Sequence, residues 1–154
     1  MKVINIYVET DIRGVGKKKG HYIYLLETET SKGVATIHDI KEIEATRDIA
    51  ELTALVAAVG RLKQYPADLN LYVTSEQLKL NIVHYLHIWA KNNFCKQNGQ
   101  RLSCFKLWES LWLNTNIFHM RVYNKTHSYS KWLLKELENG KSSLAKGDKN
   151  NAKS

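Results

Sequence analysis

The stretch "LNLYVTSEQLKL", residues 69–80, changes from the alternation of a β-strand to the spacing of a helix. Apolar and polar side chains alternate over residues 69–74, and a helical pattern begins after Ser75, which is a predicted N-cap. Ligands and catalytic groups commonly collect where a strand of an open α/β sheet passes into a helix. This junction offers the hydroxyl groups of Thr74 and Ser75 and the carboxylate of Glu76.

The N-terminal part of the chain is predicted to form an antiparallel meander of three strands. Residues 2–11 alternate apolar and polar side chains, residues 21–28 form the next apolar run, and residues 33–40 form the third. A basic, glycine-rich loop over residues 13–20 joins the first two strands.

The rest of the chain alternates between helical and strand patterns. The predicted elements are a helix over 48–62 with Thr46 as its N-cap, a strand over 69–74, a helix over about 76–93, a helix near 105–112, a strand over 117–123 and a helix near 132–137. A helix that connects two strands of one sheet makes them parallel. The order β-β-β-α-β-α-α-β-α therefore predicts an α/β fold with a mixed five-stranded sheet and helices on both faces.

Length and charge indicate one basic domain. The chain has 154 residues and a formal charge of +8, and its C-terminal stretch 139–154 has four Lys and one Asp, or +3. Residues 1–138 therefore carry 8 − 3 = +5. We expect one domain over residues 1–138 and a disordered Lys-rich tail over 139–154. The charge favours an anionic partner, although lysines that serve solubility are the alternative interpretation.

Cysteine spacing and hydropathy exclude two classes of protein. Cys95 and Cys104 lie nine positions apart, without the short spacing of a zinc site. We see neither a signal peptide nor an apolar run of membrane length, so we expect a cytoplasmic protein with no membrane partner.

Five short stretches, in this order and spacing, resemble the ribonuclease H family over roughly residues 3–138. They are "INIYVETD" (4–11), "TRDIAELTALVAAV" (46–59), "YLHIWAKNNF" (85–94), "LW" (107–108) and "KTH" (125–127). The resemblance implies the ribonuclease H-like fold and hydrolysis of the RNA strand of an RNA–DNA hybrid by two divalent metal ions. Such ions require several hard oxygen ligands on one small surface, because the two cations repel each other unless anionic groups lie between them.

Only some of the family's catalytic residues have matching residues in this sequence. The first aspartate falls on Glu9, the helix glutamate matches Glu51, and the aspartate after the fourth strand falls on Thr74. The last aspartate falls on Lys135, and the histidine of the family's loop matches His127. Two of the four carboxylates therefore remain, and Thr74 could at most hold a metal-bound water.

Two nearby acids could replace the missing carboxylates. Asp11 shares a strand face with Glu9, and Glu76 follows Thr74 by two residues. If the protein is active, we expect Mg²⁺ or Mn²⁺, with Glu9, Glu51 and Glu76 as metal ligands and Asp11 as a further catalytic candidate. Otherwise we expect no cofactor. In the alternative interpretation, Glu9 and Asp11 are a solvated acidic pair at a strand end and Glu51 complements the dipole of its helix. His127 is then an ordinary loop histidine.

The segment "WAKNNFCKQNGQRLSCFKLW", residues 89–108, interleaves cations with aromatic residues. Cations neutralise phosphates, and an exposed aromatic ring packs against a sugar or base. Trp89 and Phe105 fall on apolar stripes and are predicted core residues. The candidates for nucleic-acid binding are Lys91, Asn92, Phe94, Lys96, Arg101 and Lys106.

Three hypotheses remain open from the sequence. The first is a divergent nuclease that acts on an RNA–DNA hybrid or another RNA-containing duplex, with weak or absent activity. The second is a catalytically inactive module that retains nucleic-acid binding. The third is an adaptor whose sheet edge or tryptophan-bearing helices dock another protein.

Overall fold

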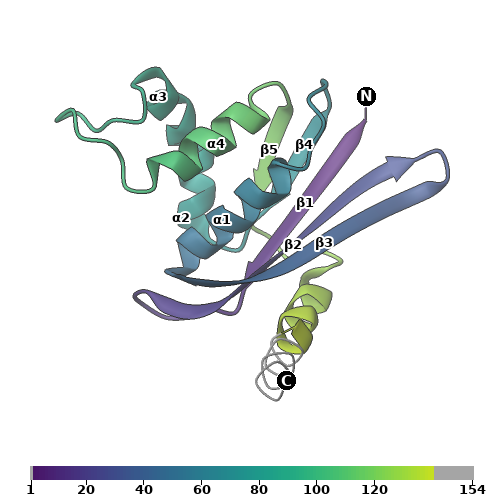
Figure 1. Cartoon of the computed structure of the whole chain (residues 1–154). Helices are drawn as coiled ribbons and strands as arrows, with labels where there is room; N and C mark the ends of the chain where they lie inside the picture. Colours follow the sequence, from purple (N-terminus) through teal and green to yellow (C-terminus); the bar gives the residue numbers. More distant parts are fainter. Residues whose placement is uncertain (1, 141–154) are drawn as a thin grey trace, which may run out of the picture.

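The computed structural model describes residues 2–140 of the chain. Its elements follow the predicted order (Figure 1). They are β1 (Val3–Thr10), β2 (Lys18–Thr30), β3 (Gly33–Ala45), α1 (Arg47–Val59), β4 (Asp68–Tyr72), α2 (Glu76–Leu80), η1 (Asn81–Tyr85), α3 (Leu86–Lys91), α4 (Phe105–Thr115), β5 (His119–Tyr123) and a C-terminal helix over 130–140.

The five strands form one mixed sheet in the order β3-β2-β1-β4-β5. β1 pairs antiparallel with β2, as does β2 with β3, whereas β1 and β4 are parallel and so are β4 and β5. The predicted mixed five-stranded sheet is therefore confirmed. Since β1 and β4 run in the same direction, their carboxyl ends lie together at one edge of the sheet.

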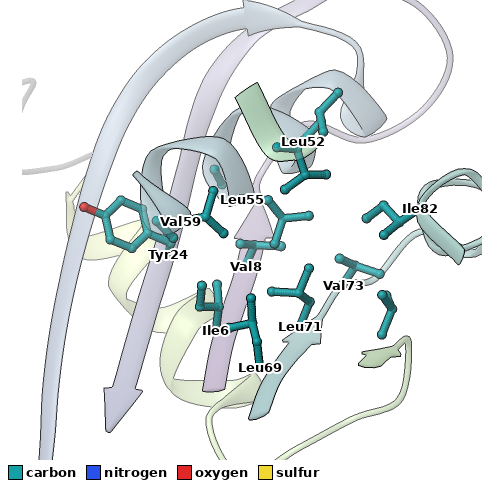
Figure 2. Close-up of a cluster of buried hydrophobic side chains, with 14 of the residues drawn as sticks. Ile6, Val8, Tyr24, Leu52, Leu55, Val59, Leu69, Leu71, Val73 and Ile82 are labelled. Carbon is teal, nitrogen blue, oxygen red and sulfur yellow. The ribbon is translucent and has the colours of Figure 1, made fainter. Parts of the chain in front are cut away.

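The main core lies between the sheet and α1. The apolar side of α1 presents fully buried leucines to the central strands (Figure 2). Its partners on the sheet are Ile6, Val8, Leu69, Leu71 and Val73, and Ile82 of η1 closes the cluster. The alternation in β1 and the helical spacing in α1 produce this arrangement, because each pattern presents one apolar face.

The C-terminal helix covers part of the opposite face of the sheet (Figure 1). Leu133 and Leu137 pack against Tyr7, Ile23 and Leu25 in a second, smaller core. Helices therefore lie on both faces, as predicted. The tail predicted from residue 139 begins inside this helix, which includes residues 139–140, and residues 141–154 lie outside the described part of the chain.

Both predicted N-caps are present. The Thr46 side chain accepts a hydrogen bond from the Ile49 N–H, and the Ser75 side chain accepts one from the Leu78 N–H at 3.1 Å. The helix that follows Ser75 contains the π-helical segment η1, which the sequence pattern did not predict. A π-helical turn inserts one extra residue per turn and often lies at a functional surface.

Within residues 2–140, no helix has the length and hydropathy needed to cross a bilayer.

Candidate active site

The carboxyl ends of β1 and β4 and the first turns of α1 enclose the candidate active site. Glu9 lies near the end of β1, two residues after Tyr7, which pairs with Tyr72 of β4. Thr74 follows the end of β4. α1 crosses above this edge and brings Glu51 to Thr74. Glu9, Glu51 and Thr74 therefore lie at the same edge of the sheet.

Glu51 is fully buried, and Thr74 occupies both of its carboxylate oxygens. The Thr74 backbone N–H donates to Oε1 at 2.7 Å, and the Thr74 hydroxyl donates to Oε2 at 2.9 Å. Thr74 stands where the resemblance places an aspartate, and its hydroxyl supplies a donor that an ionised aspartate lacks. The substitution therefore changes a second carboxylate into a hydrogen-bond partner of the first.

Arg47 completes this group from the preceding turn of α1. Its Nη2 donates to the Thr74 Oγ1 at 2.7 Å, and its Nε lies 4.0 Å from the Glu51 Oε2. The Nε is buried and has no hydrogen-bond partner among residues 2–140. Thr74 thus bridges the guanidinium group of Arg47 and the carboxylate of Glu51, which lies one turn later in α1.

Glu9 has a guanidinium neighbour of its own. Only 8% of Glu9 is exposed, and its Oε1 lies 3.4 Å from Nη2 of Arg13. The Arg13 Nη1 also donates to the backbone oxygens of Thr10 and Ile12, which fixes the side chain over the end of β1. Each candidate catalytic carboxylate therefore lies beside an arginine four residues away in the sequence.

The surroundings raise the pKa of Glu51 to about 7. Burial is the largest cause, because it disfavours the charged carboxylate, and the nearby Glu9 carboxylate acts in the same direction. The hydrogen bonds from Thr74 and the charge of Arg47 lower the pKa in part. Near neutral pH, Glu51 is therefore protonated in a substantial fraction of the molecules.

Comparison with known proteins identifies the relatives of this chain. No family model matches the chain. It is 35% identical over 71 residues to ribonuclease H of Rickettsia bellii and 32% identical over 71 residues to ribonuclease HI of Rickettsia conorii. These matches cover 46% of this chain and 45–46% of the relatives, so the chain spans about half the length of the curated relatives it matches.

Solved structures show the same fold. LC9-RNase H1, described as a type 1 RNase H with the type 2 active-site motif, matches with a TM-score of 0.69 and 14% identity over 90% of this chain and 71% of that one. The N-terminal RNase H domain of rv2228c from Mycobacterium tuberculosis matches with a TM-score of 0.58 and 14% identity over 96% of this chain and 99% of that one. The comparisons thus show sequence similarity to ribonuclease H over about half of this chain and the ribonuclease H-like fold over most of it.

Asp11 is bound to His21, and Glu76 lies on the surface. Both oxygens of Asp11 contact His21: Oδ1 accepts from the backbone N–H at 2.6 Å, and Oδ2 lies 2.9 Å from Nδ1. Glu76 is exposed and lines a separate pocket with Lys79 and His84. Within residues 2–140, no three His, Cys, Asp or Glu side chains come together as a metal site.

The remaining predicted catalytic residues lie beside this edge of the sheet. The His127 ring packs on the Tyr7 ring with centroids 4.5 Å apart, its Nδ1 accepts from the Tyr129 N–H at 3.2 Å, and burial lowers its pKa. Lys135 is exposed, whereas Leu134 of the same helix lines a pocket with Arg13. The positive charges beside Glu9 and Glu51 come from Arg13 and Arg47, which the sequence analysis did not single out.

The structure corrects the role of Phe94. The sequence analysis treated it as an exposed aromatic side chain, but only 6% of it is exposed and it belongs to the main core. Asn93 and Phe94 both have positive φ angles, 53° and 58°, and this turn directs the ring inward. The polar candidates of this segment are all exposed: Lys91, Asn92, Lys96, Arg101 and Lys106.

The raised pKa of Glu51 predicts a pH-dependent stability. The pKa lies at 4.5 in the absence of these surroundings and at about 7 in the folded protein, so the folded state binds the proton more tightly. As pH rises through this interval, the free energy of unfolding should fall relative to that of Glu51→Gln, by about 3 kcal/mol in total.

Urea unfolding between pH 4.5 and 8 at constant ionic strength measures this difference. Glu76→Gln is the matched control, because Glu76 is exposed, and its curve should stay parallel to that of the wild type. A Glu51→Gln curve that also stays parallel would contradict the prediction.

Proposed function

We propose that the chain binds an RNA-containing duplex, such as an RNA–DNA hybrid, and that metal-assisted hydrolysis of the RNA strand is weak or lost. One observation carries the second part of this proposal: a guanidinium group lies beside each of the two remaining carboxylates, Glu9 and Glu51.

The charge of the site supports the loss of metal binding. Even with both carboxylates ionised, the two carboxylates and two guanidinium groups sum to zero, whereas a pair of divalent cations requires an excess of anionic oxygen ligands. Glu51 also has a pKa of about 7, so protons compete for its oxygens at neutral pH. The residues present therefore do not fit a two-metal site.

The hydrogen bonds of Glu51 support the same conclusion. Its two oxygens accept from the Thr74 backbone N–H and the Thr74 hydroxyl, and the side chain is fully buried. These donors and the burial of Glu51 restrict the directions from which a metal ion could reach its oxygens, and displacing one buried donor would cost about 1–3 kcal/mol. The site is thus stable as an internal polar network.

The basic protrusion over residues 91–106 supports duplex binding. It presents the exposed Lys96 and Arg101 on the loop between α3 and α4, and the exposed Lys91 and Lys106 at the adjoining ends of these two helices. RNA-containing duplexes are recognised mainly through phosphates and 2′-hydroxyl groups rather than base sequence. A chain of similar fold, the foamy viral protease–reverse transcriptase, has been solved with double-stranded DNA and with an RNA/DNA hybrid, at TM-scores of 0.61 and 0.57.

The second candidate function is a divalent-metal-dependent endoribonuclease acting on the hybrid. The curated relatives, which are named ribonuclease H, favour it. In that case Glu9 and Glu51 would be the first ligands, and either Asp11 would have to leave His21 or the exposed Glu76 would have to turn toward them.

Duplex binding should depend on the basic protrusion and on salt. Replacing Lys96 and Arg101 together by Gln should weaken hybrid binding severalfold at about 0.1 M salt, and should reduce the slope of log K against log salt by about 2, because two phosphate contacts are removed. Fluorescence anisotropy in EDTA measures both quantities.

The control for this experiment is the double variant Lys32→Gln/Lys63→Gln. It removes the same charge from exposed positions at the β2–β3 turn and after α1. An equal loss of affinity in this control would show that net charge alone, rather than the protrusion, determines binding.

A cleavage assay separates the two candidate functions. With a hybrid labelled on its RNA strand, in Mg²⁺ and then in Mn²⁺, the wild type should release fragments no faster than Glu51→Gln. Wild-type cleavage that Glu51→Gln abolishes would instead establish the endoribonuclease.

A further inference from the structure

The outer edge of β5 borders a groove that the proposed duplex site does not use. β5 is the last strand of the sheet and contacts η1 at its side (Figure 1). Between them lies an open groove of about 540 Å³. This groove is separate from Glu9, Glu51 and the protrusion, since none of those residues lines it.

The groove combines an apolar floor with a cationic rim. Its apolar lining includes Leu86, Trp112 and Met120. The lining also includes Lys79, His87 and Arg121 but no Asp or Glu. A ligand that matches this surface carries negative charge beside a flat or apolar body.

A row of tyrosine rings ends at the same β5 edge, on the face of the sheet opposite the apolar floor of the groove. Tyr7, Tyr72 and Tyr123 are direct neighbours across β1, β4 and β5, so their side chains share one face of the sheet. The Tyr7 and Tyr72 rings stack with centroids 4.6 Å apart, and the Tyr72 and Tyr123 rings with centroids 5.0 Å apart. Tyr123 is the last ring of the stack and is only half-buried.

A second exposed cation lies over the terminal ring. The Lys125 Nζ is 4.9 Å from the centroid of Tyr123, and the exposed Arg121 lies two residues before it on β5. The long, exposed Lys125 side chain can move from the ring to a phosphate, so that a base can stack on Tyr123 while Lys125 and Arg121 pair with phosphates.

The end of β5 also lies next to the candidate active site. The Val73 N–H donates to the Tyr123 backbone oxygen at 2.8 Å, and Thr74 follows Val73 directly. A strand that leaves a duplex at the site would therefore reach the Tyr123 ring within a short distance.

We propose that the β5 edge binds single-stranded nucleic acid, with a base against Tyr123 and phosphates on Lys79, Arg121 and Lys125. This inference goes beyond the proposed function, which concerns a duplex and the basic protrusion. An acidic peptide would satisfy the cations but would leave the stacked rings without a role.

Anisotropy of labelled single-stranded oligonucleotides of about 12 nucleotides tests the proposal, with DNA and RNA of the same sequence as separate arms. Tyr123→Leu should weaken binding about fivefold or more, whereas Tyr123→Phe should retain it, because the ring provides the stacking. Arg121→Gln/Lys125→Gln, which changes exposed side chains only, should weaken binding severalfold and lower its salt dependence.

Matched controls give the test its specificity. Tyr85→Leu removes an exposed ring outside the groove, and Lys32→Gln/Lys63→Gln removes two distant charges; both should bind like the wild type. Hybrid binding by Tyr123→Leu should also be unchanged, so that a failure here is distinguished from a failure of the proposed duplex site.

Three results would overturn the proposal. The wild type could fail to bind either oligonucleotide, the Arg121 and Lys125 variant could bind as tightly as the wild type, or polyglutamate could compete as well as the oligonucleotide. Because Arg121 and Lys125 are exposed, the second result remains decisive even if Tyr123→Leu is unstable.

Discussion

The fully buried Glu51 carboxylate and its contacts with Thr74 and Arg47 are the constraint on which the candidate site depends. A charged group can be buried only with partners that replace its lost hydration. Thr74 supplies two hydrogen bonds and Arg47 supplies opposite charge. The same three side chains join α1 to the end of β4, so the network also holds the helix over the carboxyl ends of the central strands.

In the proposed function, the charges of this network leave the site neutral, which does not suit a pair of divalent metal ions. In the ribonuclease H site the carboxylates would repel one another unless cations lay between them. Here Arg13 and Arg47 provide fixed positive charge at the two acids that remain. Other Lys and Arg side chains are exposed on the protrusion over residues 91–106 and at the β5 edge. Both surfaces are suited to phosphates, and neither requires a metal ion.

Sequence patterns predicted the order of elements along the chain, the mixed five-stranded sheet and both N-caps, because alternation and helical spacing are local properties of Ile4–Val8 and of α1. Phe94 was misplaced because its inward direction depends on two positive φ angles. Arg13 and Arg47 were missed although each lies four residues from its acid. Their pairing with Glu9 and Glu51 concerns the site only because the fold brings β1, α1 and β4 together. The partner of Asp11 was equally hidden, because His21 reaches it through the β1–β2 hairpin.

The most direct test of the central claim is a crystal structure of the protein grown near pH 7.5 and soaked in millimolar Mn²⁺. Anomalous difference maps locate bound manganese without reference to activity. We predict that no manganese peak lies between Glu9 and Glu51 and that the Arg47 and Thr74 contacts with Glu51 persist. Two ordered manganese ions at these carboxylates, with Arg13 and Arg47 displaced, would contradict the account.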